Sequence, residues 1–197
     1  GRLKMRKSGA EVRSPTIAEC LSHTSGLPGG TMGRLPASSP IRTSNQAGVA
    51  TSLAKQGLAA KPGTKYAYTF RGFAAVARCV EVLTGKRFPE ILEERLLKPL
   101  GMSSTTFQPD LELLKRHPRY AKHIANLDDE KISAFLEKKK RESKRFVNAG
   151  GGLISTPDDL VKFYRLHSLR GKIVAKHGGS AGRVARDGRR AWQLLIP

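Results

Sequence analysis

The chain has 197 residues, a length that suits one sizeable domain. Its 39% of hydrophobic residues are enough for a buried core, which excludes a wholly disordered chain, and no apolar run is long enough to cross a bilayer. The 36 Lys and Arg residues against 16 Asp and Glu residues give a formal net charge of +20 at pH 7. Such an excess favours contact with polyanions such as RNA, and a generally basic protein without such a partner is the simpler alternative.

The first part of the chain combines a basic start with a helix and a loop. Residues 1–13 are basic and lack the apolar segment of a signal peptide, so we interpret them as a basic N-terminal extension. Ser14 and Pro15 suit the N-cap and the first position of a short helix that reaches Leu21. Residues 29–48 are rich in Gly, Ser, Pro and Thr, and we predict a loop there.

Helices dominate the rest of the chain. Their predicted ranges are 49–60, 72–84, 88–99, 110–114, 128–145 and 156–167. The helix at 128–145 becomes strongly basic in its second half. The signal for strands is confined to residues 64–69, 172–176 and 191–196.

Cysteines and histidines show no metal-binding spacing. Cys20 and Cys79 stand far apart without a Cys-x-x-Cys motif, which favours two free thiols and leaves a disulfide as the alternative. The five histidines lack the spacing of a motif such as His-Glu-x-x-His. We therefore expect neither a metal site nor a cofactor.

Basic residues gather in three clusters, which together favour a polyanion partner: the runs 138–145 and 183–190, and Arg2, Lys4, Arg6, Lys7 and Arg13 at the start of the chain. We predict that the two runs bind nucleic acid. The predicted contact residues are Lys138, Lys139, Lys140, Arg141, Lys144, Arg145, Arg183, Arg186, Arg189 and Arg190. The aromatic residues do not follow the spacing of a base-stacking surface, so we expect electrostatic contact with the RNA backbone. A solvated charged face is the alternative for each run.

Five motifs follow one another along the chain. They are ECLSHTSGLP, KPGTKYAYTFRGF, TGKRFPEILEERLLKPLGMSSTTF, NAGGGLISTPDDLVKFY and KHGGSAG. In this order they resemble the serine beta-lactamase-related family, which includes class C beta-lactamases and penicillin-binding proteins. The resemblance covers roughly residues 14–182, which we take as one beta-lactamase-like domain followed by a short basic segment at 183–197. It implies an α/β (α+β) fold in which a helical region packs on a reduced antiparallel sheet.

The resemblance also implies nucleophilic catalysis by a serine in a Ser-x-x-Lys motif, assisted by a tyrosine motif and a Lys/His-x-Gly motif. The family's Tyr-x-Asn motif falls on Tyr68-Thr69-Phe70, so its tyrosine is present and its asparagine is replaced. The third motif falls on His177-Gly178-Gly179. Tyr68, His177 and Gly179 are therefore the predicted positions of a vestigial catalytic site.

Several of these motif positions have simpler interpretations. Ser-x-x-Lys is missing from its expected place before HTSGLP, and Ser52 and Lys55 match it only by spacing, in a segment that varies in the family. Tyr68 can pack at a strand end, and the segment from His177 can form only a tight turn. We expect His23 to hold its loop by hydrogen bonds.

We interpret the chain as a catalytically inactive domain that serves as a scaffold. Its charge suits an RNA-contacting component of a large ribonucleoprotein with neighbouring proteins as further partners, and analogy with a mitochondrial relative suggests a mitochondrial ribosome. The alternative is an active serine hydrolase or peptidase that acts on a small-molecule substrate and whose Ser-x-x-Lys motif precedes Gly1. A self-assembling scaffold without nucleic acid is a third hypothesis.

Overall fold

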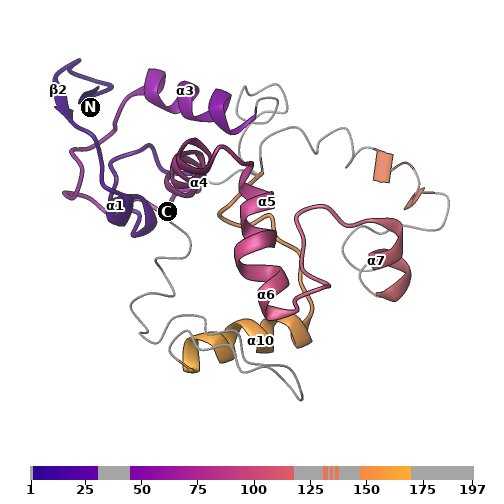
Figure 1. Cartoon of the computed structure of the whole chain (residues 1–197). Coiled ribbons are helices and arrows are strands. Elements are labelled where there is room, and N and C mark those ends of the chain that lie inside the picture. Colours follow the sequence, from indigo (N-terminus) through magenta and orange to yellow (C-terminus); the bar gives the residue numbers. More distant parts are fainter. Residues whose placement is uncertain are drawn as a thin grey trace. The chain divides into compact units, whose positions relative to one another are not determined.

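Figure 1 shows the computed structural model, which describes residues 2–30, 45–117, 131–132, 134, 136–137 and 147–169. The chain divides into two compact units. The first unit comprises residues 1–79 and 129–152, and the second comprises residues 80–128 and 153–197. None of the helices within the described ranges is long and apolar enough to cross a membrane.

The basic N-terminal residues form a two-stranded antiparallel hairpin. Strand β1 (Arg2–Lys4) pairs with strand β2 (Glu11–Arg13), and Leu3 lies opposite Val12. Residues that lie directly opposite each other point to the same face of a sheet, so Leu3 and Val12 share one face. Both pack against the core of the first unit. The hairpin is the reduced antiparallel sheet of the described residues.

Helix α1 (Ile17–Leu21) begins later than the sequence predicts. Its N-cap is Thr16 rather than Ser14, because the Thr16 hydroxyl accepts a hydrogen bond from the Glu19 N–H and the Glu19 carboxylate accepts one from the Thr16 N–H. The Arg13 guanidinium also donates to Glu19, at 2.8 Å. The hydrogen bond from Arg13, followed by the one from Thr16, lowers the pKa of Glu19 to about 2.

Helix α3 (Gln46–Gln56) begins earlier than the predicted range of 49–60. The side chain of Asn45 caps it by accepting a hydrogen bond from the Gly48 N–H at 3.0 Å. The predicted loop at 29–48 is therefore too long at its C-terminal end, because an asparagine in a polar stretch acts as a helix cap.

The core of the first unit gathers apolar side chains from α3, from the loops around it and from the following helix. Its buried members are Leu27, Val49, Leu53, Leu58, Phe70 and Ala74, and Leu3, Met5 and Val12 pack against them. All six buried members are at most 6% exposed. Burial on this scale removes apolar area from water and stabilises the unit.

A hydrogen bond joins two distant segments of the first unit. Gln46 is 4% exposed, and its Nε2 donates to the carbonyl of Val147 at 3.0 Å. Its Oε1 is buried and has no hydrogen-bond partner among the residues that the structure describes. The start of α3 is thereby tied to a segment about a hundred residues further along the chain.

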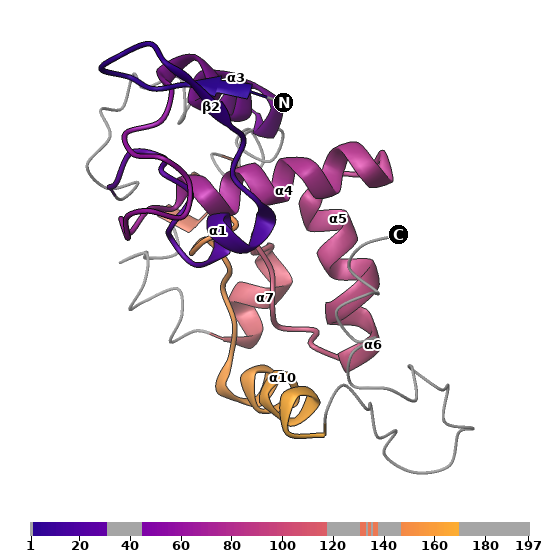
Figure 2. The same cartoon turned by 90° about the vertical axis from the view of Figure 1, so that its left-hand side faces the viewer.

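Helix α4 (Arg71–Thr84) confirms the helix predicted at 72–84. Ala74 and Ala77 are buried on its inner side, each 1% exposed. Figure 2 shows α1 beside the start of α4, and a Cβ atom added at Gly72 would lie 2.2 Å from the carbonyl oxygen of Cys20. Only glycine allows this close approach of the two helices.

The predicted strand at 64–69 is wrong. Thr64 lies in a bend, residues 65–68 have no regular secondary structure, and Thr69 makes an isolated parallel bridge with Gly30. Of the helix predicted at 128–145, the described residues 131–132, 134 and 136–137 are helical. The strands predicted at 172–176 and 191–196 lie outside the described residues.

The second unit contains a helical run that changes its winding partway. It consists of α5 (Phe88–Leu92), the π-helical turn η2 (Glu93–Leu97) and α6 (Lys98–Leu100), and it ends at Gly101 with φ 64°. The sequence predicts that Pro99 ends the helix. The run passes through Pro99, which has no N–H to donate, and the wider π-helical turn ends at Leu97, two residues before it.

Two capped helices complete the described part of the second unit. Helix α7 (Leu111–Arg116) is capped by Asp110, as predicted, whose side chain accepts from the Leu113 N–H at 2.7 Å. Helix α10 (Pro157–Ser168) begins after the predicted cap, Thr156. Short polar side chains at these positions satisfy the free N–H groups of a first helical turn.

Asp159 is the centre of a buried polar network within the second unit. It is 2% exposed and accepts hydrogen bonds from the Ser104 N–H at 2.8 Å, the Thr105 hydroxyl at 2.8 Å and the Lys162 ammonium at 2.7 Å. Burial acts to raise its pKa, but the hydrogen bonds from Lys162, Thr105 and Ser104 together lower the pKa below its ordinary value. The network holds the segment after Gly101 on the first turn of α10.

Replacement of this carboxylate should destabilise the protein in a pH-dependent way. We expect Asp159→Asn to lower the free energy of unfolding by about 2 kcal/mol at pH 7, because Lys162 loses its charged partner. The ionised form is the one stabilised by folding, so the difference from the parent should shrink as the pH falls below the ordinary aspartate pKa of about 4. Urea unfolding between pH 3 and pH 7 measures this.

The neighbouring Asp158 provides the matched control, because it is exposed in the same helical turn. Asp158→Asn should change the free energy of unfolding by less than about 1 kcal/mol. Equal losses in the two variants, or a loss for Asp159→Asn that persists unchanged at pH 3, would contradict the assigned network.

Candidate functional site

Tyr68 stands in an exposed aromatic corner of the first unit. Its side chain is 57% exposed, and its ring centroid lies 4.6 Å from that of His23. The rings of Phe73 and Tyr66 approach His23 at 5.4 Å and 5.7 Å. The tyrosine that the sequence predicts as a site residue is thus supported from one side and open to solvent.

His23 holds this corner through its backbone and its ring. Its φ of 61° lies in the left-handed region, which histidine tolerates better than most residues. Its Nδ1 accepts a hydrogen bond from the Thr69 N–H at 3.3 Å, and its carbonyl accepts one from the Ala67 N–H at 2.9 Å. These bonds confirm the expected loop-holding role of His23.

Phe70 stands where the resemblance predicts the family's asparagine, and it faces the core. It is 6% exposed and belongs to the hydrophobic cluster around Val49 and Leu58. A phenyl ring also has no hydrogen-bond donor or acceptor. Position 70 therefore cannot supply the side-chain amide that the Tyr-x-Asn motif supplies in the family.

Arg71 is a buried cation that the sequence analysis missed. It is 8% exposed, and its NH1 group donates to the carbonyls of Pro28 and Gly29 at 2.7 Å and 2.8 Å. Burial, followed by the charge of Arg6, lowers its pKa. The signal that could have found it is its place at the start of α4, where the helix dipole disfavours a positive charge.

The loop held by Arg71 reaches the tyrosine. Gly29 is followed by Gly30, whose N–H donates to the carbonyl of Tyr68 at 3.0 Å. Gly30 has φ 129°, a conformation that favours glycine. Arg71 therefore acts on the Tyr68 segment through one loop, as a positioning residue.

Ser52 and Lys55 lie on α3 beside a pocket of about 460 Å³. Both residues line it, together with Gln56, whose Nε2 donates to the Ser52 hydroxyl at 3.3 Å. Lys55 is exposed, and no hydrogen bond between Ser52 and Lys55 is found among the described residues. The spacing of a Ser-x-x-Lys motif is present here without the hydrogen bond through which a lysine would activate the serine.

The remaining predicted site residues lie outside the described residues. They are His177 and Gly179 of the third motif, and all ten basic residues predicted to contact nucleic acid, from Lys138 to Arg145 and from Arg183 to Arg190. Their predicted roles stay predictions.

The described residues contain no group of three or more His, Cys, Asp or Glu that could hold a metal ion. Cys20 and Cys79 are free thiols, the first buried and the second exposed. Burial raises the pKa of Cys20 to about 11, and the nearby Cys79 and Glu19 add to this shift. The Cys20 thiol is therefore protonated at neutral pH and is a poor nucleophile.

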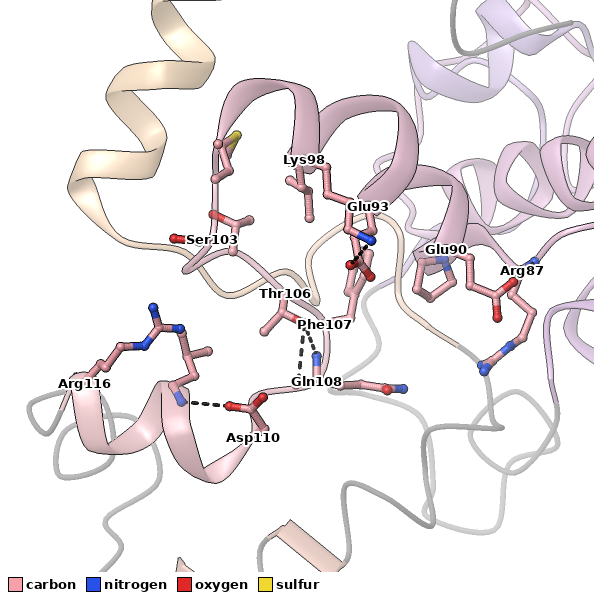
Figure 3. Close-up of a pocket in the computed structure, with 16 residues that line it drawn as sticks. Arg87, Glu90, Glu93, Lys98, Ser103, Thr106, Phe107, Gln108, Asp110 and Arg116 are labelled. Carbon is pink, nitrogen blue, oxygen red and sulfur yellow. Dashed lines mark hydrogen bonds and ion pairs between the residues drawn. The ribbon is translucent and has the colours of Figure 1, made fainter. Parts of the chain in front are cut away.

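The second unit contains a larger pocket, of about 690 Å³, between the α5–α6 run and α7 (Figure 3). We call it the α5–α7 pocket. Its lining includes buried Leu97 and Met102 and the charged residues Glu93, Lys98 and Arg116. It contains none of the motif residues predicted for catalysis.

Comparison with known proteins places these motifs in context. The family model for beta-lactamases matches residues 7–197. Penicillin-binding protein 4 of Amycolatopsis lactamdurans is 30% identical over 160 residues, which are 80% of this chain and 39% of the relative. The D-alanyl-D-alanine-carboxypeptidase/endopeptidase AmpH of Escherichia coli (strain K12) is 27% identical over 152 residues, 75% of this chain and 35% of the relative.

Solved structures show the same fold. The beta-lactamase/D-alanine carboxypeptidase of Yersinia pestis matches with a TM-score of 0.51 and 25% identity, over 81% of this chain and 43% of that one. The octameric penicillin-binding protein homologue of Pyrococcus abyssi matches with a TM-score of 0.53 and 22% identity, over 85% and 37% of the two chains. The chain thus spans about two fifths of the length of these relatives.

Removal of the Arg71 guanidinium should loosen the tyrosine corner. We expect Arg71→Met to accelerate amide hydrogen exchange at Gly29, Gly30 and residues 67–69 by at least about tenfold, because two charge-assisted hydrogen bonds are lost. Hydrogen-exchange mass spectrometry measures this. Lys65→Met is the control, because it replaces a cation by the same side chain at an exposed position, and it should leave the exchange rates of both segments unaltered. Unaltered exchange in Arg71→Met would contradict a positioning role for Arg71.

Proposed function

Because the chain belongs to the beta-lactamase family, we propose that it forms part of a serine acyl-hydrolase domain in which Tyr68 transfers a proton and residue 70 does not contact the substrate. The observation that carries this proposal is the contrast between two neighbouring motif positions. Tyr68 is 57% exposed, whereas Phe70 is 6% exposed in the core. The motif keeps its proton-transfer group and lacks its amide.

The chemistry that suits this corner is acyl transfer. A tyrosine hydroxyl next to a reacting serine can accept its proton and pass it to the leaving group. In this proposal the nucleophilic serine lies outside residues 1–197, and His177-Gly178-Gly179 forms the edge that binds the substrate and the oxyanion. In this proposal Ser52 is not the nucleophile, which is supported by the absence, among the described residues, of a hydrogen bond between Ser52 and Lys55, whereas the Ser52 hydroxyl accepts one from Gln56.

The names of the relatives suggest the class of substrate. One is a penicillin-binding protein and another is a D-alanyl-D-alanine-carboxypeptidase/endopeptidase. We propose that this domain acts on an acyl compound of related kind, with a changed preference. A substrate whose amide is held by an asparagine in the family would lose that hydrogen bond to Phe70, which favours substrates that do not need it.

Covalent labelling tests the acyl-hydrolase proposal. We expect a fluorescent fluorophosphonate to label the native protein on a serine outside residues 1–197, and Tyr68→Phe to slow labelling by about a hundredfold, the usual effect of losing a general base. Tyr66→Phe is the matched control, because Tyr66 is exposed and also contacts His23. Mass mapping of an adduct to Ser52, or folded protein without an adduct, would overturn the proposal.

The charge of the chain favours a second candidate function. With a net charge of +20, the domain suits an inactive scaffold that contacts RNA in a large assembly such as a mitochondrial ribosome, and that location is part of the same proposal. The replacement of the motif asparagine by buried Phe70 agrees with lost catalysis. The predicted RNA contacts are the ten basic residues of the runs 138–145 and 183–190.

Salt dependence tests this second candidate. Replacing Lys138, Lys139, Lys140 and Arg141 with alanine should weaken binding to a structured RNA and lower the slope of log K against log salt by about 3, because each phosphate contact contributes about 0.7–0.9. A control variant removes four other charges, at exposed Lys55, Lys61, Lys65 and Lys115. Equal slopes for the two variants, or no binding at low salt by the parent protein, would count against the RNA contact.

A further inference from the structure

We propose that the outer face of α10 is a self-association surface, on which a second copy of this chain docks with its own α10 in antiparallel orientation. We call this surface the α10 face, and it consists of Leu160, Val161 and Tyr164 with Asp158 and Arg165 at one edge. It contains no residue of the proposed acyl-transfer site, so the inference is independent of the proposed function.

Exposed apolar side chains are concentrated on this helix. In the described part of the chain twelve large apolar residues are exposed, and four of them lie in the range 160–169, at Leu160, Val161, Tyr164 and Leu169. Tyr164 is 64% exposed, Val161 55% and Leu160 42%. Single exposed apolar side chains are ordinary on a protein surface, but a cluster on one helix face is typical of an interaction site.

The helical repeat places this cluster on the side of α10 that faces away from its own unit. The inner side is fixed by Asp159, which is 2% exposed and accepts hydrogen bonds from the Ser104 N–H and the Thr105 hydroxyl. At about 100° per residue, Val161 and Tyr164 lie about 160° and 140° around the helix from Asp159. The buried network therefore occupies one side of α10, and the opposite side is open to a partner.

The charges at the edge of the α10 face are complementary to those of a second copy. Asp158 and Arg165 are seven residues apart, so they lie two turns apart along the same edge, beside Val161. The midpoint between them falls between Val161 and Lys162, close to the middle of the apolar cluster. A two-fold axis through this midpoint places Asp158 of each copy level with Arg165 of the other. A parallel arrangement would instead place like charges side by side.

The size of the α10 face predicts a weak dimer. A contact between two helices buries less than the roughly 1,200–2,000 Å² of a stable complex, so we expect a Kd on the order of 10–100 µM. The net charge of +20 on each copy acts against association, although salt at about 0.15 M screens charges beyond about 8 Å. The apolar cluster supplies most of the affinity, and the two ion pairs set the antiparallel orientation.

Analytical ultracentrifugation of the native protein tests the proposal. At about 0.15 M salt, a concentration series should give a reversible equilibrium between monomer and dimer. Tyr164→Ala should raise the Kd by about tenfold or more, because a central tyrosine often contributes much of the affinity of an interface. Tyr66→Ala is the matched control, since Tyr66 is 63% exposed and lies in the first unit, and it should change the Kd by less than about twofold.

Charge reversal tests the antiparallel orientation. Asp158→Arg and Arg165→Asp should each raise the Kd by about tenfold or more, because each creates two pairs of like charges across the interface. The double variant should recover the parent Kd to within about threefold. Arg165→Asp also lowers the net positive charge, so general repulsion alone would strengthen association in this variant. Glu112→Arg makes the same charge change as Asp158→Arg at an exposed position of α7, and should change the Kd by less than about twofold.

The double variant also controls for folding, because it carries whatever cost either substitution imposes on the helix. A monomer at every concentration would overturn the proposal, and this result is expected if another part of the protein or a different partner covers the α10 face. Equal weakening by Tyr164→Ala and Tyr66→Ala, or a double variant as weak as the single ones, would also overturn it. Covalent labelling of a serine does not depend on this surface, so either proposal can fail without the other.

Discussion

The corner that presents Tyr68 depends on one buried guanidinium. Arg71 donates to two backbone carbonyls just before Gly30, and Gly30 donates in turn to the carbonyl of Tyr68. Neutral carbonyls offset the desolvation of a cation less well than a carboxylate would, and the Phe70 ring adds a contact at 5.4 Å from the guanidinium carbon. Because both hydrogen bonds come from one planar group, the loop and the tyrosine segment are held together as a single structural element.

Much of the helical fold could be predicted from the sequence, and the errors have local physical causes. Apolar periodicity located α4 and α10, and capping residues located the start of α7. The start of α1 was predicted at Ser14-Pro15, but the helix is capped by Thr16. The Thr16 and Glu19 side chains each accept a hydrogen bond from the other residue's backbone N–H, and this capping box fixes the helix start. Pro99 was taken as a helix end, although a preceding π-helical turn lets the run continue to Leu100. The segment 64–69 has residues that are common in strands, but within the described part of the chain no strand lies beside it and only Thr69 makes a bridge, so composition alone could not predict whether it pairs.

The sequence motifs were enough to propose the residues of the candidate site. They could not predict which of these side chains face solvent and which face the core. The order of the motifs assigns the family's tyrosine to Tyr68, and the role of Tyr68 stays a prediction, because the family match gives only the range 7–197. Whether a side chain faces solvent or core depends on tertiary packing, so the burial of Phe70 and Arg71 required the structure. The α5–α7 pocket brings together residues of the α5–α6 run, of α7 and of the loop between them, and no spacing in the sequence marks such a site. In the same way, a basic composition indicates that a polyanion is a suitable partner, but it does not show which surface of the protein would bind it.

The hydrogen bond from Gln46 to Val147 also bears on how the chain is made. A ribosome completes α3 long before it adds residue 147, so the buried amide of Gln46 waits for a partner that is synthesised about a hundred residues later. Until then the apolar side chains around Val49 lie near a Gln46 side chain that has not yet formed its hydrogen bond to Val147. Closing so long a loop also carries a conformational-entropy cost. The first unit therefore cannot complete this contact until residue 147 has been synthesised.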